Sequence, residues 1–188
     1  SDLIRSEAFS VVTLNTIFRQ AQKSLIVVNA HKINRGHFPI LANESRKSNF
    51  YFIQKEEPEA VLSTIVDLVC HRIPHRFNLD AVDEVQVLTP MHRGLVGAGN
   101  LNSELQNALN PSAVSVKRGN REFRRQDKVM QIRNNYDKNV YNGDIGRITD
   151  ISEMDRSMLI DFDGRTVEYD FSNLDELVHA YAVSVHKS

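Results

Sequence analysis

The chain has 188 residues, a formal net charge of −1 and 41% hydrophobic residues, which is typical of one soluble globular domain with a small insert. Its single cysteine, Cys70, excludes a disulfide framework and fits a reducing, cytoplasmic compartment. No apolar run approaches the ~18 residues that a membrane-spanning helix needs, so we expect no membrane partner.

The first two thirds of the chain have the pattern of an α/β protein. The segment from Glu56 to Cys70 predicts a helix, because Pro58 suits its first turn and apolar residues recur on one face. Pro90 should end the strand before it, and Asn100 is a candidate helix cap. We expect a parallel sheet with this order of elements: helix 20–35, strand 50–53, helix 56–70, strand 84–89 and helix 101–109.

From about Lys117 the pattern changes to short strands with tight turns. Asn142-Gly143 and Asp163-Gly164 favour such turns because both dipeptides tolerate positive φ. Along the last candidate, Val167 and Tyr169 alternate with acidic residues. These features predict a small SH3-like barrel with strands over 128–133, 145–151, 158–162 and 165–171. The apolar segment Tyr181–Val185 then predicts a buried strand.

Charge is unevenly distributed along the chain. The segment from Lys117 to Arg147 contains nine basic and four acidic residues, whereas the segment from Asp150 to Glu176 contains two basic and nine acidic residues. A basic surface beside an acidic one would suit a polyanion that lies along one edge.

The ends of the sequence indicate a piece of a larger protein. The chain starts at Ser1 without a methionine, and it ends with His186-Lys187-Ser188 directly after the apolar segment. In α/β proteins the corner between a strand and the next loop often carries ligand-contacting groups. We therefore expect ligand contacts at this end.

Three groups of residues are candidate sites with an ordinary structural alternative for each. Arg19 and Gln20 would start the first helix, where an arginine can reach a phosphate; the alternative is a solvated side chain. Gly94, Gly97 and Gly99 follow no Walker pattern, since no glycine is followed by Lys-Ser/Thr, and a flexible loop is the simpler interpretation.

The third group is the hairpin around Asn142 and Arg147, where Tyr136 and Tyr141 offer aromatic faces to bases; the alternative is an ordinary solvated hairpin. A metal site is not expected, because Cys70, His71 and His75 lack a fourth ligand.

The ordered set of motifs resembles the second motor domain of superfamily 1 helicases of the RecD/TraA type, which are related to the exodeoxyribonuclease V alpha subunit. The similar stretches span nearly the whole chain: Ile17–Ala21, Val87–Met91 with the glycine run to Asn102, Asn134–Asp137, Val140–Arg147 and Ala180–Ser188.

The resemblance implies a RecA-like (P-loop NTPase-type) domain over 1–118, an inserted SH3-like β-barrel over 119–172, and a return to the first domain over 173–188. It also implies that Arg19, with Gln20 beside it, contacts the γ-phosphate of ATP across an interdomain cleft. Residues similar to the family's single-strand contacts are Thr89, His92, Arg93, Asn142, Arg147, Ser184, His186 and Lys187.

The resemblance implies that the parent protein would be an ATP-dependent DNA helicase that translocates 5′→3′ on single-stranded DNA. ATP and Mg²⁺ would be held by the first motor domain, whose P-loop lysine and Mg²⁺-binding acid are missing here. Subunits of a nuclease complex are further candidate partners. We therefore expect this chain alone not to hydrolyse ATP. The alternative is a non-enzymatic module with an SH3-like barrel that binds nucleic acid or protein.

Overall fold

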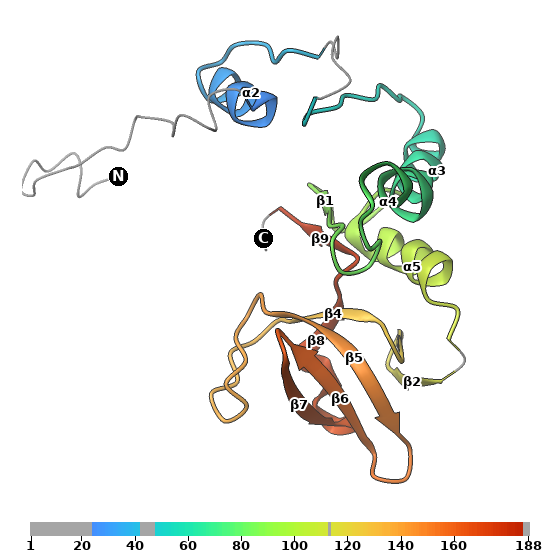
Figure 1. The fold of residues 1–188 in the computed structure, drawn as a ribbon. Coiled ribbons are helices and arrows are strands. Elements are labelled where there is room, and N and C mark those ends of the chain that lie inside the picture. Colours follow the sequence, from blue (N-terminus) through green and yellow to red (C-terminus); the bar gives the residue numbers. More distant parts are fainter. Residues whose placement is uncertain (1–23, 42–47, 113, 186–188) are drawn as a thin grey trace, which may run out of the picture. The chain divides into compact units, whose positions relative to one another are not determined.

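The computed structural model describes residues 24–41, 48–112 and 114–185, which fall into two compact units divided after Gln54 (Figure 1). In the first unit, helix α2 (Leu25–Asn34) begins after its cap Ser24, whose hydroxyl accepts a bond from the Val27 N–H. The buried Asn29 side chain bonds both backbone groups of Ile40 and so ties the following segment to the helix.

The predicted strand at 50–53 is not a strand in the structure. Tyr51, Phe52 and Ile53 are each at least 40% exposed. A strand is stable only when neighbouring strands pair its backbone, and no ladder forms around this segment within the described ranges. An apolar run alone was therefore a misleading signal.

The second unit contains a small parallel sheet covered by helices. Strands β1 (Val87–Thr89) and β9 (Ala182–Ser184) pair in parallel, so the predicted parallel sheet is confirmed for two strands and extends no further among the described residues. Leu101, Leu105 and Val69 are buried beside this sheet. The helices of this part are α3 (Pro58–Asp67), the π-helical turn η2 (Leu68–Arg72), α4 (Ile73–Phe77) and α5 (Ala98–Leu109).

The start of α5 differs from the prediction. The helix begins at Ala98 with Gly97 as its cap, whereas Asn100 lies inside the first turn and its side chain donates to the Leu95 carbonyl. Gly97 is needed there because its backbone packs directly against Arg93.

The rest of the unit is an open antiparallel sheet with the order β7-β6-β5-β4-β8 and a separate hairpin, and the predicted closed barrel does not form among the described residues. All four predicted strands are present, and Phe123, Ile148, Met158 and Tyr169 are fully buried in their core. The sheet comprises β4 (Lys128–Gln131), β5 (Ile145–Ser152), β6 (Ser157–Phe162), β7 (Arg165–Asp170) and β8 (Leu177–His179).

Two turns in this part of the unit show how far local signals were reliable. Asp163 and Gly164 both have positive φ and connect β6 to β7 in a two-residue turn, as predicted. The hairpin β2 (Ser115–Arg118) and β3 (Arg121–Arg124) was missed, although Gly119-Asn120 between them is a turn signal of the same kind. A 3₁₀ helix, η3 (Phe171–Glu176), connects β7 to β8.

Gly97→Ala should lower the free energy of unfolding by about 1–3 kcal/mol, because a Cβ at this position would lie 2.5 Å from the Arg93 carbonyl oxygen. Gly99→Ala should instead raise it by up to about 1 kcal/mol, since alanine favours helix and the nearest atom to its Cβ outside the helix, the His92 carbonyl oxygen, lies at 3.6 Å. Denaturant titration of the two variants measures the difference. Equal losses in both would contradict the steric explanation.

Candidate nucleic-acid interface

The parallel pairing of β1 with β9 brings two predicted site residues together. Thr89 and Ser184 are the last residues of their strands and lie opposite each other in the register. Both are buried, and the Thr89 hydroxyl donates to the Val96 carbonyl (2.9 Å) while accepting from the Met91 N–H (3.3 Å). Thr89 therefore shapes the loop that follows β1.

The loop after β1 adds His92 and Arg93 to the same edge of the sheet. His92 Nε2 lies 3.1 Å from Ser184 Oγ, and the histidine tautomer decides which of them donates. The position of α5 beside them is fixed by Asn102, whose amide bonds both backbone groups of Ala182. Three predicted residues, Thr89, His92 and Ser184, thus gather where the strands end, which is the usual ligand position in open α/β sheets, and Arg93 follows His92 in the same loop.

Three N–H groups of the glycine loop are not available to a phosphate. The N–H groups of Gly97, Ala98 and Gly99 donate to the carbonyls of Gly94, Met91 and His92, respectively. Because these donors are already used inside the loop, they do not offer the free N–H groups that a phosphate loop presents. Nor could any group of three His, Cys, Asp or Glu side chains in the described ranges hold a metal ion.

Four predicted residues lie outside the described residues: Arg19, Gln20, His186 and Lys187. The remaining two are Asn142 and Arg147. Asn142 lies in the connection between β4 and β5, and Arg147 lies in β5 of the antiparallel sheet. The structure therefore does not bring Asn142 and Arg147 into the group at the end of β1 and β9.

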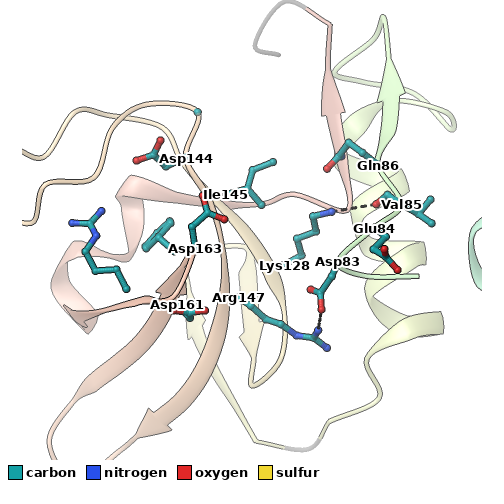
Figure 2. A pocket seen from close by; sticks show the side chains of 14 residues that line it. Asp83, Glu84, Val85, Gln86, Lys128, Asp144, Ile145, Arg147, Asp161 and Asp163 are labelled. Atoms are coloured by element: carbon teal, nitrogen blue, oxygen red, sulfur yellow. Dashed lines mark hydrogen bonds and ion pairs between the residues drawn. The ribbon is translucent and has the colours of Figure 1, made fainter. Parts of the chain in front are cut away.

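Arg147 lines a groove of about 970 Å³ between the antiparallel sheet and the segment before β1 (Figure 2). Its guanidinium donates to Asp83 at 2.7 Å, and the buried Lys128 donates to the Val85 carbonyl at 3.1 Å. Burial lowers the pKa of Lys128, although Asp83 and Asp80 oppose that shift. Three cations, Lys128, Arg147 and Arg165, face five carboxylates in this groove: Asp83, Glu84, Asp144, Asp161 and Asp163.

A second groove, of about 640 Å³, runs beside α5 and starts at the predicted group. His92 and Ser184 line it near the beginning of α5, and Arg124 lines it near the end of α5, where it bonds Asn107. Its walls carry Asn102, Gln106, Asn107 and Asn120, and its charged residues are Arg121, Arg124 and Glu122. Neutral amides and an excess of arginine make this groove suitable for a nucleic-acid strand.

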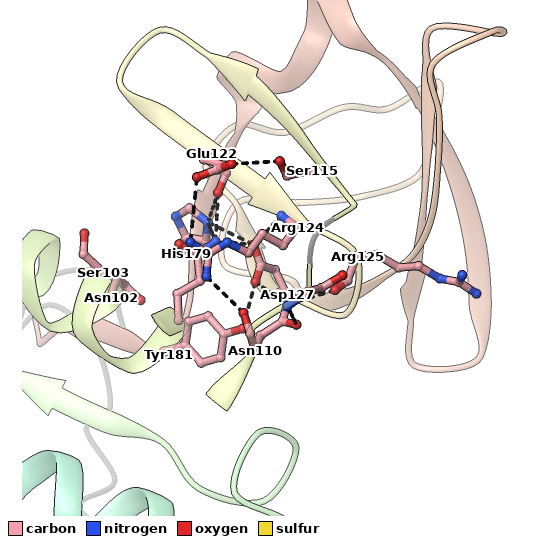
Figure 3. A network of polar contacts seen from close by, with 12 residues as sticks. Asn102, Ser103, Asn110, Ser115, Glu122, Arg124, Arg125, Asp127, His179 and Tyr181 are labelled. Atoms are coloured by element: carbon pink, nitrogen blue, oxygen red, sulfur yellow. Dashed lines mark hydrogen bonds and ion pairs between the residues drawn. The ribbon is translucent and has the colours of Figure 1, made fainter. Parts of the chain in front are cut away.

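A buried carboxylate, Asp127, holds α5, the β2–β3 hairpin, β8 and the start of β9 together (Figure 3). Its oxygens accept from the side chains of Gln106 (2.6 Å), Asn110 (2.7 Å) and Tyr181 (2.9 Å) and from the Arg124 N–H (2.7 Å). His179 Nε2 lies 3.2 Å from Asp127 and 3.2 Å from the Glu122 carbonyl. The same nitrogen lies 3.1 Å from the Gln106 amide nitrogen, and the histidine tautomer decides which of these groups donates.

Sequence reasoning missed this network and the α5 groove. The donors to Asp127 come from positions between 106 and 181, so no local spacing links them. The cations of the β2–β3 hairpin could have been found from the sequence. The excess of basic residues from Lys117 was noted, but the hairpin that carries them was not predicted.

Comparison with known proteins places the chain beside DNA helicases. Residues 101–162 match the family model described as the SH3 domain of ATP-dependent RecD-like DNA helicases. The chain is 29% identical over 186 residues to the ATP-dependent RecD2 DNA helicase of Deinococcus radiodurans. The resemblance to RecD-like helicases is confirmed. The alignment covers 99% of this chain and 24% of that relative, so the chain spans about a quarter of the relative's length.

Solved structures of Pif1 helicase from Bacteroides sp. are also similar. The unliganded form has a TM-score of 0.40 at 17% identity and covers 56% of this chain and 43% of its own. The form with ADP-AlF4 has a TM-score of 0.39 at 18% identity, and the match covers 71% of this chain and 41% of that structure's chain. Within the described ranges, no helix is both long and apolar enough to cross a membrane.

Asp127→Asn should lower the free energy of unfolding by about 3–5 kcal/mol, because the new amide group would face donors that now bond a carboxylate. Asp150→Asn is the matched control. Asp150 is exposed and lies 3.9 Å from Arg125, so its loss should cost less than about 1 kcal/mol. Denaturant unfolding measures both, and similar small losses would contradict the role of Asp127.

The same pair of proteins should show a pH dependence. Burial opposes ionisation of Asp127, but its bonds from His179, Arg124 and Asn110 outweigh burial and hold its pKa below the usual value. Its contribution to stability is therefore present above about pH 4 and lost as the pH falls through the lower folded pKa. The difference in unfolding free energy between wild type and Asp127→Asn should shrink below about pH 4. A constant difference would contradict this assignment.

Proposed function

We propose that the chain is the C-terminal part of an ATP-dependent DNA helicase, in which it supplies a RecA-like second motor domain and an SH3-like insert. The support is the similarity to the RecD2 helicase along the chain together with the group at the ends of β1 and β9. In this proposal Thr89 shapes the loop after β1, and His92, Arg93 and Ser184 contact single-stranded DNA.

The observation that carries the proposal is the pairing of β1 with β9. It places two segments more than 90 positions apart in the chain, each with a predicted DNA-contacting residue, at one edge. The α5 groove continues from this edge, so a strand bound there has a polar surface to follow. His186 and Lys187 follow Ser184 closely in sequence and are proposed to extend these contacts. Asn142 and Arg147 lie apart from this edge, and we do not include them in the proposed path.

ATP and Mg²⁺ are proposed to be held by another domain of the parent protein. No glycine in this chain is followed by Lys-Ser/Thr, and the N–H groups of Gly97, Ala98 and Gly99 are bonded within the glycine loop. This chain's proposed contribution is Arg19, with Gln20 beside it. A guanidinium near the γ-phosphate stabilises the charge that develops on phosphoryl transfer.

In the full-length protein, Arg19→Ala should reduce DNA-stimulated ATP turnover by at least about 10³-fold, because an arginine at the γ-phosphate contributes that much or more to phosphoryl transfer. Binding of single-stranded DNA should change little. Arg35→Ala is the matched control, since Arg35 ends α2 and its side chain is exposed. Phosphate release and fluorescence anisotropy give the two readouts; turnover that survives in Arg19→Ala would remove Arg19 from the ATP site.

Movement in the 5′→3′ direction is proposed from the resemblance to RecD-like helicases. The full-length protein with ATP should unwind a duplex that carries a 5′ single-stranded tail and leave the same duplex with a 3′ tail intact. Strand separation is followed by gel electrophoresis. Equal unwinding of both substrates, or of the 3′-tailed one alone, would refute the direction. DNA binding with no turnover in the full-length protein would favour the non-enzymatic module instead.

A further inference from the structure

We propose that the β2–β3 hairpin is a phosphate-binding surface, onto which single-stranded nucleic acid continues from the end of β1 and β9 by way of the α5 groove. The inference rests on the proposed function for its starting point, the edge with His92 and Ser184. It adds a second contact region, which lies at the other end of α5.

The first argument is the charge of the hairpin. Between Ser115 and Arg125 one carboxylate, Glu122, accompanies five cations, and four of these cations are exposed to solvent. The five are Lys117, Arg118, Arg121, Arg124 and Arg125. Such a cluster on a two-stranded hairpin attracts a polyanion, because each phosphate that it neutralises releases a counterion.

The second argument is that a continuous groove leads to this hairpin. Gly99 N–H donates to the His92 carbonyl near the start of α5, and Arg124 bonds Asn107 near its end. The helix between positions 99 and 107 is about 12 Å long. Both of its ends, and the hairpin residues Asn120 and Arg121, line the same groove.

The third argument is that two arginines are held in position with donors to spare. Arg124 donates to the Asn110 carbonyl (3.0 Å) and to Asn107 Oδ1 (2.9 Å), and it lies 3.7 Å from the Glu122 carboxylate. Arg121 donates to the Leu177 carbonyl (2.9 Å). A guanidinium has five N–H donors, so these bonds orient each group and leave donors for a phosphate. A preorganised arginine loses less conformational entropy when it binds.

The other groove is a poor route for the strand. Its five carboxylates outnumber its three cations, and one of those cations, Arg147, is already paired with Asp83 (Figure 2). A phosphate chain would meet repulsion there. The two grooves therefore differ in the sign of their charge, and the α5 groove fits the polyanion.

Binding of a fluorescent oligothymidylate to the full-length protein, without nucleotide, tests the proposal over about 50–200 mM salt. The double variant Lys117→Gln/Arg121→Gln should flatten the plot of log K against log salt by about 0.7 for each phosphate that the hairpin no longer neutralises. Arg72→Gln removes a positive charge from an exposed position in η2, where Arg72 lies 3.9 Å from Asp67, and should leave the slope unchanged.

Glu122→Gln gives a result of the opposite sign. It removes the groove's carboxylate and keeps an oxygen that can accept the bond from Ser115, so binding should tighten by about two- to fivefold. A folding defect would weaken binding, so tighter binding supports the phosphate surface.

The outcomes separate this inference from the proposed function. If His92→Ala weakens binding while the hairpin variants keep the wild-type slope and affinity, the hairpin proposal is wrong and the proposed function stands. If the wild-type protein does not bind oligothymidylate at all, the proposed function itself fails. An equal decrease of slope in Arg72→Gln would also overturn the hairpin proposal, because the effect would then be one of general charge.

Discussion

The arrangement of elements in the second unit depends on one buried carboxylate, that of Asp127. Asp127 is fully buried, and a carboxylate removed from water is costly unless donors surround it. Here a backbone N–H and four side chains supply that environment, and they come from α5, β3, β8 and the residues that flank α5 and β9. Removing any one element would leave the charge under-satisfied. The network therefore favours the single arrangement in which the parallel sheet, α5 and the antiparallel sheet meet.

This arrangement also builds the candidate interface. Asn102 fixes the beginning of α5 to β9, while Gln106 fixes its middle to the Glu122 carbonyl on β3. The groove beside α5 thus has one wall from the α/β part and one from the antiparallel part. Its shape depends on polar bonds between the two parts and on a small apolar cluster, in which Met130 of β4 and Val183 of β9 belong together. A change in those bonds would alter the path available to a bound strand.

Local sequence signals predicted the elements better than their assembly. Strand alternation around Tyr169 and the Asp163-Gly164 turn are short-range properties, and both were confirmed. The strand at 50–53 was wrong because a strand needs partners that its own residues do not specify. Closure of the barrel was wrong for a related reason. Whether the two edge strands of a sheet pair depends on curvature and register, and among the described strands β7 and β8 remain edges.

The sequence by itself determined the helix that starts at Pro58, the four strands of the antiparallel sheet, the segregation of charge and the resemblance to RecD-like helicases. The helix and the strands follow from periodicity and turn chemistry, which are properties of neighbouring residues, and the charge segregation and the resemblance follow from the order of segments along the chain. Only the tertiary structure decided that Thr89 and Ser184 lie side by side, that Asp127 collects its donors, and that cations line one groove while carboxylates dominate the other. Such contacts join residues tens of positions apart, and only the packing of the whole unit selects them.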